Sequence, residues 1–140
     1  MDTSRTEVSG APAYGFTTKL IGRSLADARA QVEQALKEQG FGVLTEIDAR
    51  ATFEKKLGAE FRPYVILGAC NPQLAHRALS QDLGVGLLLP CNVVLWGEAD
   101  GTVVSIADPQ AMFQVVNDAR LQPIADEATR RLRAAFESLR

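Results

Sequence analysis

The sequence has few of the residue types from which metal and catalytic sites are built. It contains two cysteines, Cys70 and Cys91, and a single histidine, His76. Structural zinc sites need about four ligands, with paired cysteines two to four residues apart, and these two cysteines lie on separate segments. The sequence therefore predicts no metal site and no cofactor, and it contains no complete catalytic constellation.

Neither charge nor long hydrophobic runs are available for nucleic acid or membrane binding. Lys and Arg total 15 and Asp and Glu total 17, which gives a net charge of −2, so no basic surface is expected for a phosphate backbone. The longest apolar run, residues 84–96, contains Pro90 and Asn92 and is shorter than the roughly 20 residues that a spanning helix needs. We expect neither nucleic acid nor membrane as a partner.

The first residues and the low cysteine content predict where the chain works. The N-terminal segment has an acid at position 2 and no apolar signal core, so it does not resemble a secretory signal. Two free thiols are typical of a reducing compartment, and we expect a cytoplasmic protein. Residues 1–13 are small and polar and predict a flexible leader, followed by a single domain over 14–140.

Hydrophobic periodicity and capping residues predict an α+β fold. Expected strands cover 14–21, 41–47, 61–70, 84–96 and 102–107, and expected helices follow Ser24, Asp48, Asn71 and Asp108, with a last helix over 123–139. The strand over 61–70 is nearly continuous in apolar residues, which predicts burial on both faces, and 84–96 is expected to be another long buried strand. Strands and helices alternate early and a hairpin at Asp100-Gly101 comes after them. This order predicts one mixed or largely antiparallel five-stranded sheet with helices packed mainly on one face.

Two similar segments carry the candidate site, GACNP at 68–72 and LPCN at 89–92. Cys70 directly precedes a predicted helix start, where unpaired amide groups favour an anion, so a lowered thiol pKa is one expectation. Cys70 is then a candidate nucleophile and Cys91 its resolving partner if the strands are neighbours. The alternative is that both thiols are small hydrophobic residues of the core.

Polar residues near the same segments are candidate ligand-binding groups. Arg62, Tyr64, Asn71 and Asn92 flank the buried strands and are expected around an apolar pocket at the strand ends. His76 lies off the apolar face of the helix that begins at Asn71, so its placement predicts a solvated or flanking side chain.

Several stretches resemble a known family. Residues 61–75 and 86–94, together with 40–44 and 108–112, are similar to the bacterial and archaeal "domain of unknown function 302" over about residues 14–139. The resemblance implies a small α/β domain that commonly forms homodimers, in the cytoplasm of a bacterium or archaeon. It implies no reaction and no catalytic residues, and only the polar leader departs from it.

Three functional hypotheses remain open from the sequence. The first is a homodimeric domain that binds a small molecule or has a regulatory role, without catalysis, with its pocket near Cys70 and Cys91. The second is a thiol-dependent redox or sulfur-handling enzyme that uses Cys70, with Cys91 as the resolving thiol. The third is a purely structural dimer module in which Trp96 marks an exposed apolar edge suited to a subunit contact.

Overall fold

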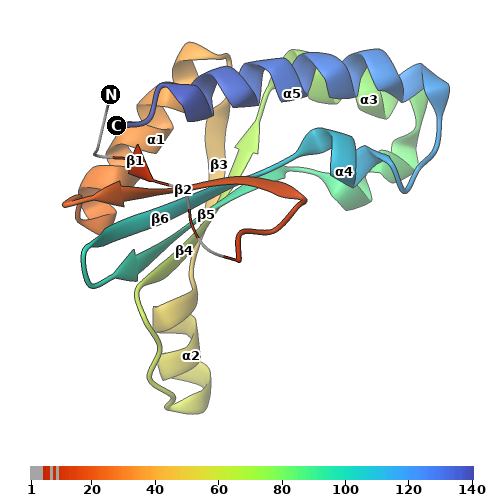
Figure 1. Ribbon diagram of the computed structural model, residues 1–140. Coiled ribbons are helices and arrows are strands. Elements are labelled where there is room, and N and C mark those ends of the chain that lie inside the picture. Colours follow the sequence, from red (N-terminus) through yellow and green to blue (C-terminus); the bar gives the residue numbers. More distant parts are fainter. Residues whose placement is uncertain (1–4, 7, 9) are drawn as a thin grey trace.

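The computed structural model describes residues 5–6, 8 and 10–140, and its centre is an antiparallel sheet (Figure 1). The strand order is β1-β2-β6-β5-β4-β3, and every neighbouring pair is antiparallel. The longer strands are β2 (Gly15–Ile21), β3 (Gly42–Asp48), β4 (Tyr64–Cys70), β5 (Cys91–Glu98) and β6 (Gly101–Ala107). The two-residue β1 (Arg5–Thr6) extends the sheet beside β2. The predicted α+β class and five-stranded sheet are confirmed, and β1 adds a short edge strand.

Capping residues set the helix starts as expected. The helices are α1 (Leu25–Glu38), α2 (Ala49–Leu57), α3 (Pro72–Gln81), α4 (Pro109–Phe113) and α5 (Gln122–Glu137). The side chains of Ser24, Asp48, Asn71 and Asp108 each accept a hydrogen bond from a backbone N–H in the first turn of the next helix. These bonds satisfy donors that have no partner inside the helix, which explains why each helix begins where it does.

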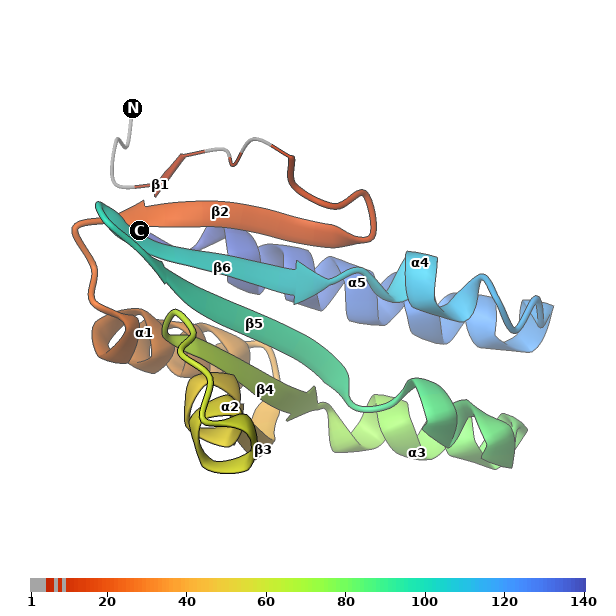
Figure 2. The same ribbon diagram turned by 90° about the horizontal axis from the view of Figure 1, so that it is seen from below.

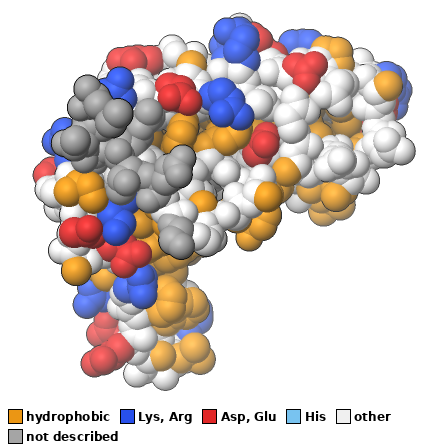
Figure 3. Space-filling view, viewed as in Figure 1, with side chains coloured by type: hydrophobic (Ala, Val, Ile, Leu, Met, Phe, Trp, Pro, Cys, Tyr) orange, Lys and Arg blue, Asp and Glu red, His pale blue; other side chains and the backbone are white. Residues whose placement is uncertain are grey.

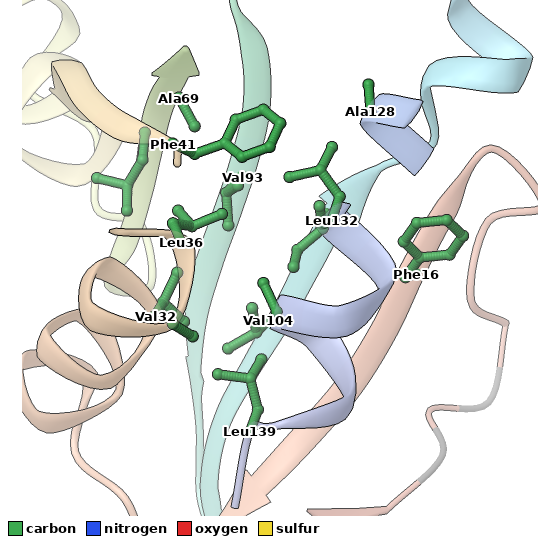
Figure 4. Packing of buried hydrophobic residues seen from close by; sticks show 14 of the residues in the cluster. Phe16, Val32, Leu36, Phe41, Ala69, Val93, Val104, Ala128, Leu132 and Leu139 are labelled. Carbon is green, nitrogen blue, oxygen red and sulfur yellow. The ribbon is translucent and has the colours of Figure 1, made fainter. Parts of the chain in front are cut away.

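The core lies between one face of the sheet and two long helices (Figure 4). In the middle of β4 and β5 alternate residues are buried, as for Leu67 and Val93, and these side chains belong to the same core cluster as residues of α1 and α5. The helices contribute residues such as Leu36 and Leu132 at helical spacing. The prediction that β4 would be buried on both faces is wrong, because Tyr64 and Ile66 on its other face are only half-buried.

The opposite face of the sheet carries little helical cover. Figures 1 and 2 show α1 and α5 on one side of the sheet, while α2 projects from the other side at the β3–β4 edge. Among the described residues, no helix lies across the middle of this second face (Figure 2). The prediction that helices pack mainly on one face is therefore confirmed.

The segment over 84–96 differs from the prediction of one long strand. Residues Leu83–Leu88 form a 3₁₀-helix that starts at Asp82, the Leu89–Pro90 peptide bond is cis, and the strand begins only at Cys91. Leu87 within the run and Leu83 just before it are exposed to solvent, although both side chains are apolar. Two glycines and a proline within the run prevent a continuous ladder, which apolar content alone does not reveal.

The N-terminal leader predicted over 1–13 lies partly outside the described residues, which omit 1–4, 7 and 9. Arg5 and Thr6 pair with Leu20 and Lys19 of β2, so this part of the leader belongs to the sheet. No helix in the described part of the chain is long and apolar enough to cross a membrane.

Candidate functional site

A small apolar pocket lies where β4 and β5 meet α3, α4 and α5. Its volume is about 30 Å³, more than the roughly 10–15 Å³ that one water needs, and its walls offer water few hydrogen-bond partners. The side chains around it come from segments that are distant in the sequence: Phe41, Ala69, Cys70, Asn71, Leu74, Ala75, Ala78, Leu89, Pro90, Cys91, Pro109, Phe113, Ile124 and Ala128. Figure 4 shows Phe41 and Ala69 at one end of the core with Ala128 across from them.

Two equivalent turns place the pocket at the end of the sheet. Asn71 and Asp108 each come directly after a strand, cap the next helix and precede a proline at its first position. Proline suits that position because its missing N–H would have no partner there. The two turns direct α3 and α4 beyond the strand ends, and α5 contacts both helices (Figure 1).

The two cysteines border the pocket as free thiols. Ala69, not Cys70, stands opposite Cys91 in the β4–β5 ladder, and successive side chains point to opposite faces of a sheet. The strands are neighbours, but the thiols are not a facing pair and no disulfide joins them. The structure therefore gives no support to Cys91 as a resolving thiol.

Burial raises the pKa of both thiols. Desolvation raises the pKa of Cys70 above its ordinary value, and it raises that of Cys91, with a smaller contribution from nearby Cys70, to about 11. The expectation of a lowered pKa at Cys70 is therefore wrong. Desolvation of the thiolate raises the pKa by more than the nearby N-terminus of α3 lowers it. Both thiols are held protonated near neutral pH, which suits an apolar wall and not a nucleophile.

We predict slow alkylation of both thiols in the folded protein. With a pKa near 11, only about one thousandth of Cys91 is thiolate at pH 8, and reaction at Cys70 is expected to rise only above its ordinary pKa of about 8.5. The measurement is the iodoacetamide rate from pH 6 to 10, with Cys91→Ser isolating Cys70 and the urea-unfolded chain as control. Rapid reaction of Cys70 below pH 8 would contradict this assignment.

The remaining polar candidates lie at different distances from the pocket. Asn71 lines it, buried, and its side chain accepts the hydrogen bond from the Leu74 N–H. Asn92 is exposed and stands opposite Gly68, on the face of the sheet that α1 and α5 do not cover. His76 is exposed as expected and borders a separate surface hollow on α3 with Arg77 and Arg120. The structure brings only Asn71 of these three to the pocket.

Arg62 and Tyr64 lie at the far end of β4. The strand places Tyr64 roughly 20 Å from Cys70, because each residue advances it about 3.4 Å. Arg62 forms an ion pair with Glu98 at 3.3 Å, and Tyr64 stacks on Trp96 with ring centroids 5.8 Å apart. Trp96 is half-buried in this stack, and its indole N–H donates to Glu98. These residues form a surface separate from the pocket.

Sequence reasoning missed the pocket residues that come from the helices and from Phe41. Ala75, Ala78, Phe113 and Ala128 are small or apolar residues on helix faces, where they are indistinguishable from core residues. The repeated Asn-Pro and Asp-Pro turns are a usable signal, since both point a helix toward the same end of the sheet. Among the described residues, no group of three or more His, Cys, Asp or Glu side chains is placed to hold a metal.

Residues 16–139 match the family described as "domain of unknown function DUF302". The chain belongs to this family. The DUF302 chain is also similar to a solved structure, the uncharacterized conserved protein DUF302 from Bacillus stearothermophilus, with 32% identity and a TM-score of 0.83. That likeness covers 92% of this chain and all of the other. No curated protein matches the chain.

Proposed function

We propose that this DUF302 chain is a non-catalytic domain that binds the apolar end of a small molecule in the Cys70 pocket, whose volume of about 30 Å³ is too small to enclose a whole ligand. The observation that carries the proposal is the pocket itself: apart from Asn71, its lining consists of apolar side chains and two protonated thiols. Ligand sites are generally apolar with a few placed polar groups, which fits this lining.

The pocket can recognise a ligand by its shape and by hydrophobic contact, and its lining residues form no catalytic group. Its one polar side chain, Asn71, already uses its carbonyl oxygen to cap α3. Neither thiol has a neighbouring base among the residues that line the pocket. The raised pKa of Cys70 weighs against a thiol-dependent enzyme, so binding is the function that this geometry favours.

We predict that linear 1-alkanols, from propanol to octanol, bind with affinity that rises with chain length and then levels off. Each buried methylene contributes about 0.8 kcal/mol, which corresponds to about fourfold in the dissociation constant. Once the pocket is filled, further carbons remain in solvent and add nothing. The length at which the affinity stops rising therefore measures the depth of the pocket. Titration calorimetry on the full chain gives the dissociation constant of each alkanol.

A pocket-filling variant and a matched control complete this test. Ala75→Leu places three more carbons in the lining and is expected to weaken octanol binding by about tenfold or more. Ala51→Leu makes the same change on the exposed side of α2 and is expected to bind like the original chain. Equal binding by both variants, or no binding by the unaltered chain, would contradict the proposal.

We further propose that the domain acts as a homodimer. The support is the sheet face that no helix crosses within the described residues, since half-buried apolar side chains on such a face gain free energy when a partner covers them.

A further inference from the structure

The side-chain amide of Asn71, which lines the Cys70 pocket, is only half used by the fold. Its carbonyl oxygen accepts the hydrogen bond from the Leu74 N–H at 3.1 Å, whereas its Nδ2 donates to no other group in the described part of the chain. The residue is only 5% exposed. A buried N–H without a partner costs free energy, so a ligand that accepts a hydrogen bond from Nδ2 gains by satisfying it.

Gly40, which follows α1, leaves a small space beside this nitrogen, and we call the space the Gly40 notch. The φ of Gly40 is 82°, in the left-handed region that favours glycine. A Cβ at this position would lie 3.0 Å from Asn71 Nδ2 and 3.1 Å from Arg131 Nη1. The two nitrogens therefore border the same notch, and solvent reaches it because Gly40 is exposed.

The Gly40 notch adjoins the apolar pocket along three segments of the chain. Asn71 borders both of them, and Phe41, which lines the pocket, directly follows Gly40. On α5, Ala128 lines the pocket, and Arg131 lies one turn later on the same side of the helix. Figure 4 shows Phe41 and Ala128 across from each other at this end of the core. A molecule whose apolar end fills the pocket therefore has both donors beside it.

Arg131 brings positive charge to the Gly40 notch. Its Nε pairs with Glu127 at 3.0 Å, and its Nη1 reaches the carbonyl oxygen of Gln39 only at 3.4 Å, so the guanidinium has further N–H donors to offer. Glu127 also pairs with Arg130, so one carboxylate faces two guanidinium groups and leaves an excess of positive charge. Figure 3 shows basic and acidic side chains interspersed along the visible side of α5, so this excess acts locally.

We infer that the ligand of the pocket is an alkyl carboxylate, with its hydrocarbon end in the pocket and its carboxylate in the Gly40 notch. The small pocket leaves the head group outside, where Asn71 Nδ2 and Arg131 donate to its oxygens at the roughly 2.7–2.9 Å of charge-assisted hydrogen bonds. A flat carboxylate suits a space opened by one missing Cβ better than the larger phosphate does. This inference rests on the pocket of the proposed function and identifies the head group of its ligand.

Titration calorimetry of the full chain with octanoate, 1-octanol and octylammonium tests the inference, because the three molecules share one hydrocarbon chain and differ in the head group. Octanoate is expected to bind at least about tenfold more tightly than octanol, since it adds charge-assisted hydrogen bonds. Octylammonium is expected to bind more weakly than octanol, because Arg131 repels it. Octyl phosphate, the larger anion, is expected to bind more weakly than octanoate.

Two substitutions remove the head-group contacts and spare the apolar lining. Asn71→Asp keeps an oxygen that caps α3 and replaces the Nδ2 donor by an anionic oxygen, so octanoate is expected to lose its advantage over octanol. Arg131→Gln removes the guanidinium and is expected to reduce the same advantage at least about fivefold. Arg130→Gln is the matched control, because Arg130 pairs with the same Glu127 but is 67% exposed, and the advantage is expected to change by less than about twofold.

The outcomes separate the head group from the pocket. The carboxylate site alone is overturned if octanol binds as tightly as octanoate, if octyl phosphate binds more tightly than octanoate, or if the advantage survives both Asn71→Asp and Arg131→Gln. Loss of the advantage in Arg130→Gln also overturns it. If neither octanol nor octanoate binds, the proposed function fails and the inference fails with it. Circular dichroism of every variant establishes that the fold is retained, and half-buried Arg131 keeps the test decisive if Asn71→Asp does not fold.

Discussion

Replacement of Leu132 by alanine is expected to lower the free energy of unfolding by about 2–5 kcal/mol. Leu132 lies in the middle of α5, is fully buried, and points between the sheet and α1 (Figure 4). Alanine removes the contacts of the larger side chain and leaves a cavity that the rigid sheet cannot close. Urea denaturation monitored by circular dichroism measures the change.

The matched control for this prediction is Leu83→Ala. The same atoms are removed there from a side chain that is exposed to solvent, so the free energy of unfolding is expected to change by less than about 0.5 kcal/mol. If both variants lost the same stability, α5 would not be the central cover of the sheet that the structure shows.

Gly101→Val is expected to destabilise the chain by about 2–3 kcal/mol. Gly101 begins β6 after the hairpin turn, and a Cβ there would overlap the carbonyl oxygen of Leu20 and approach the Cα of Ile21 to 3.0 Å. Both obstacles are backbone atoms of β2 that are paired with β6, so they cannot rotate away as a side chain would. The pair of strands must separate locally to admit the new side chain.

Gly42→Val provides the control for the strand substitution itself. A Cβ at Gly42 meets nothing within 4 Å, and its backbone is not in the left-handed region, so valine is expected to leave stability unchanged or raise it by about 0.5 kcal/mol. Thermal unfolding of both variants is the measurement. Similar midpoints for the two would contradict the close approach of β2 to Gly101.

Much of the fold can be predicted from short-range signals in the sequence. Ser24, Asp48 and Asn71 are recognisable as caps from their residue types and from the residues of the next turn, and each makes the expected bond. Gly58 ends α2 with a positive φ of 62°, a conformation that glycine adopts readily after the last turn of a helix. These signals depend on at most four neighbouring residues, so tertiary packing has little opportunity to override them.

The segment before β5 cannot be predicted in the same way. An apolar run fits a buried strand, a buried helix or an irregular connection equally well, and only the surrounding structure decides among them. Asp82 caps the 3₁₀-helix there by accepting a hydrogen bond from the Gly84 N–H. The turn leaves Leu83 and Leu87 in solvent, which hydrophobicity alone does not predict.

The site is predictable only in part, for a geometric reason. Cys70, Asn71 and Cys91 line the pocket because they lie at the same end of neighbouring antiparallel strands. Arg62 and Tyr64 belong to the same strand segment in the sequence, but the length of β4 separates them from the pocket. The thiol pKa depends on burial by residues from several elements, and no local signal at Cys70 reports it.

The most direct test of the central claim, that the pocket binds an apolar ligand, is a titration of the ¹⁵N-labelled chain with octanol, monitored by amide chemical shifts. We predict shifts concentrated at Ala69, Cys70, Asn71 and Cys91 and on the facing parts of α3 and α5, with little change in α2. Shifts confined to α2 and to the sheet face that carries Ile47 and Ile66, or the absence of saturable shifts, would contradict the claim.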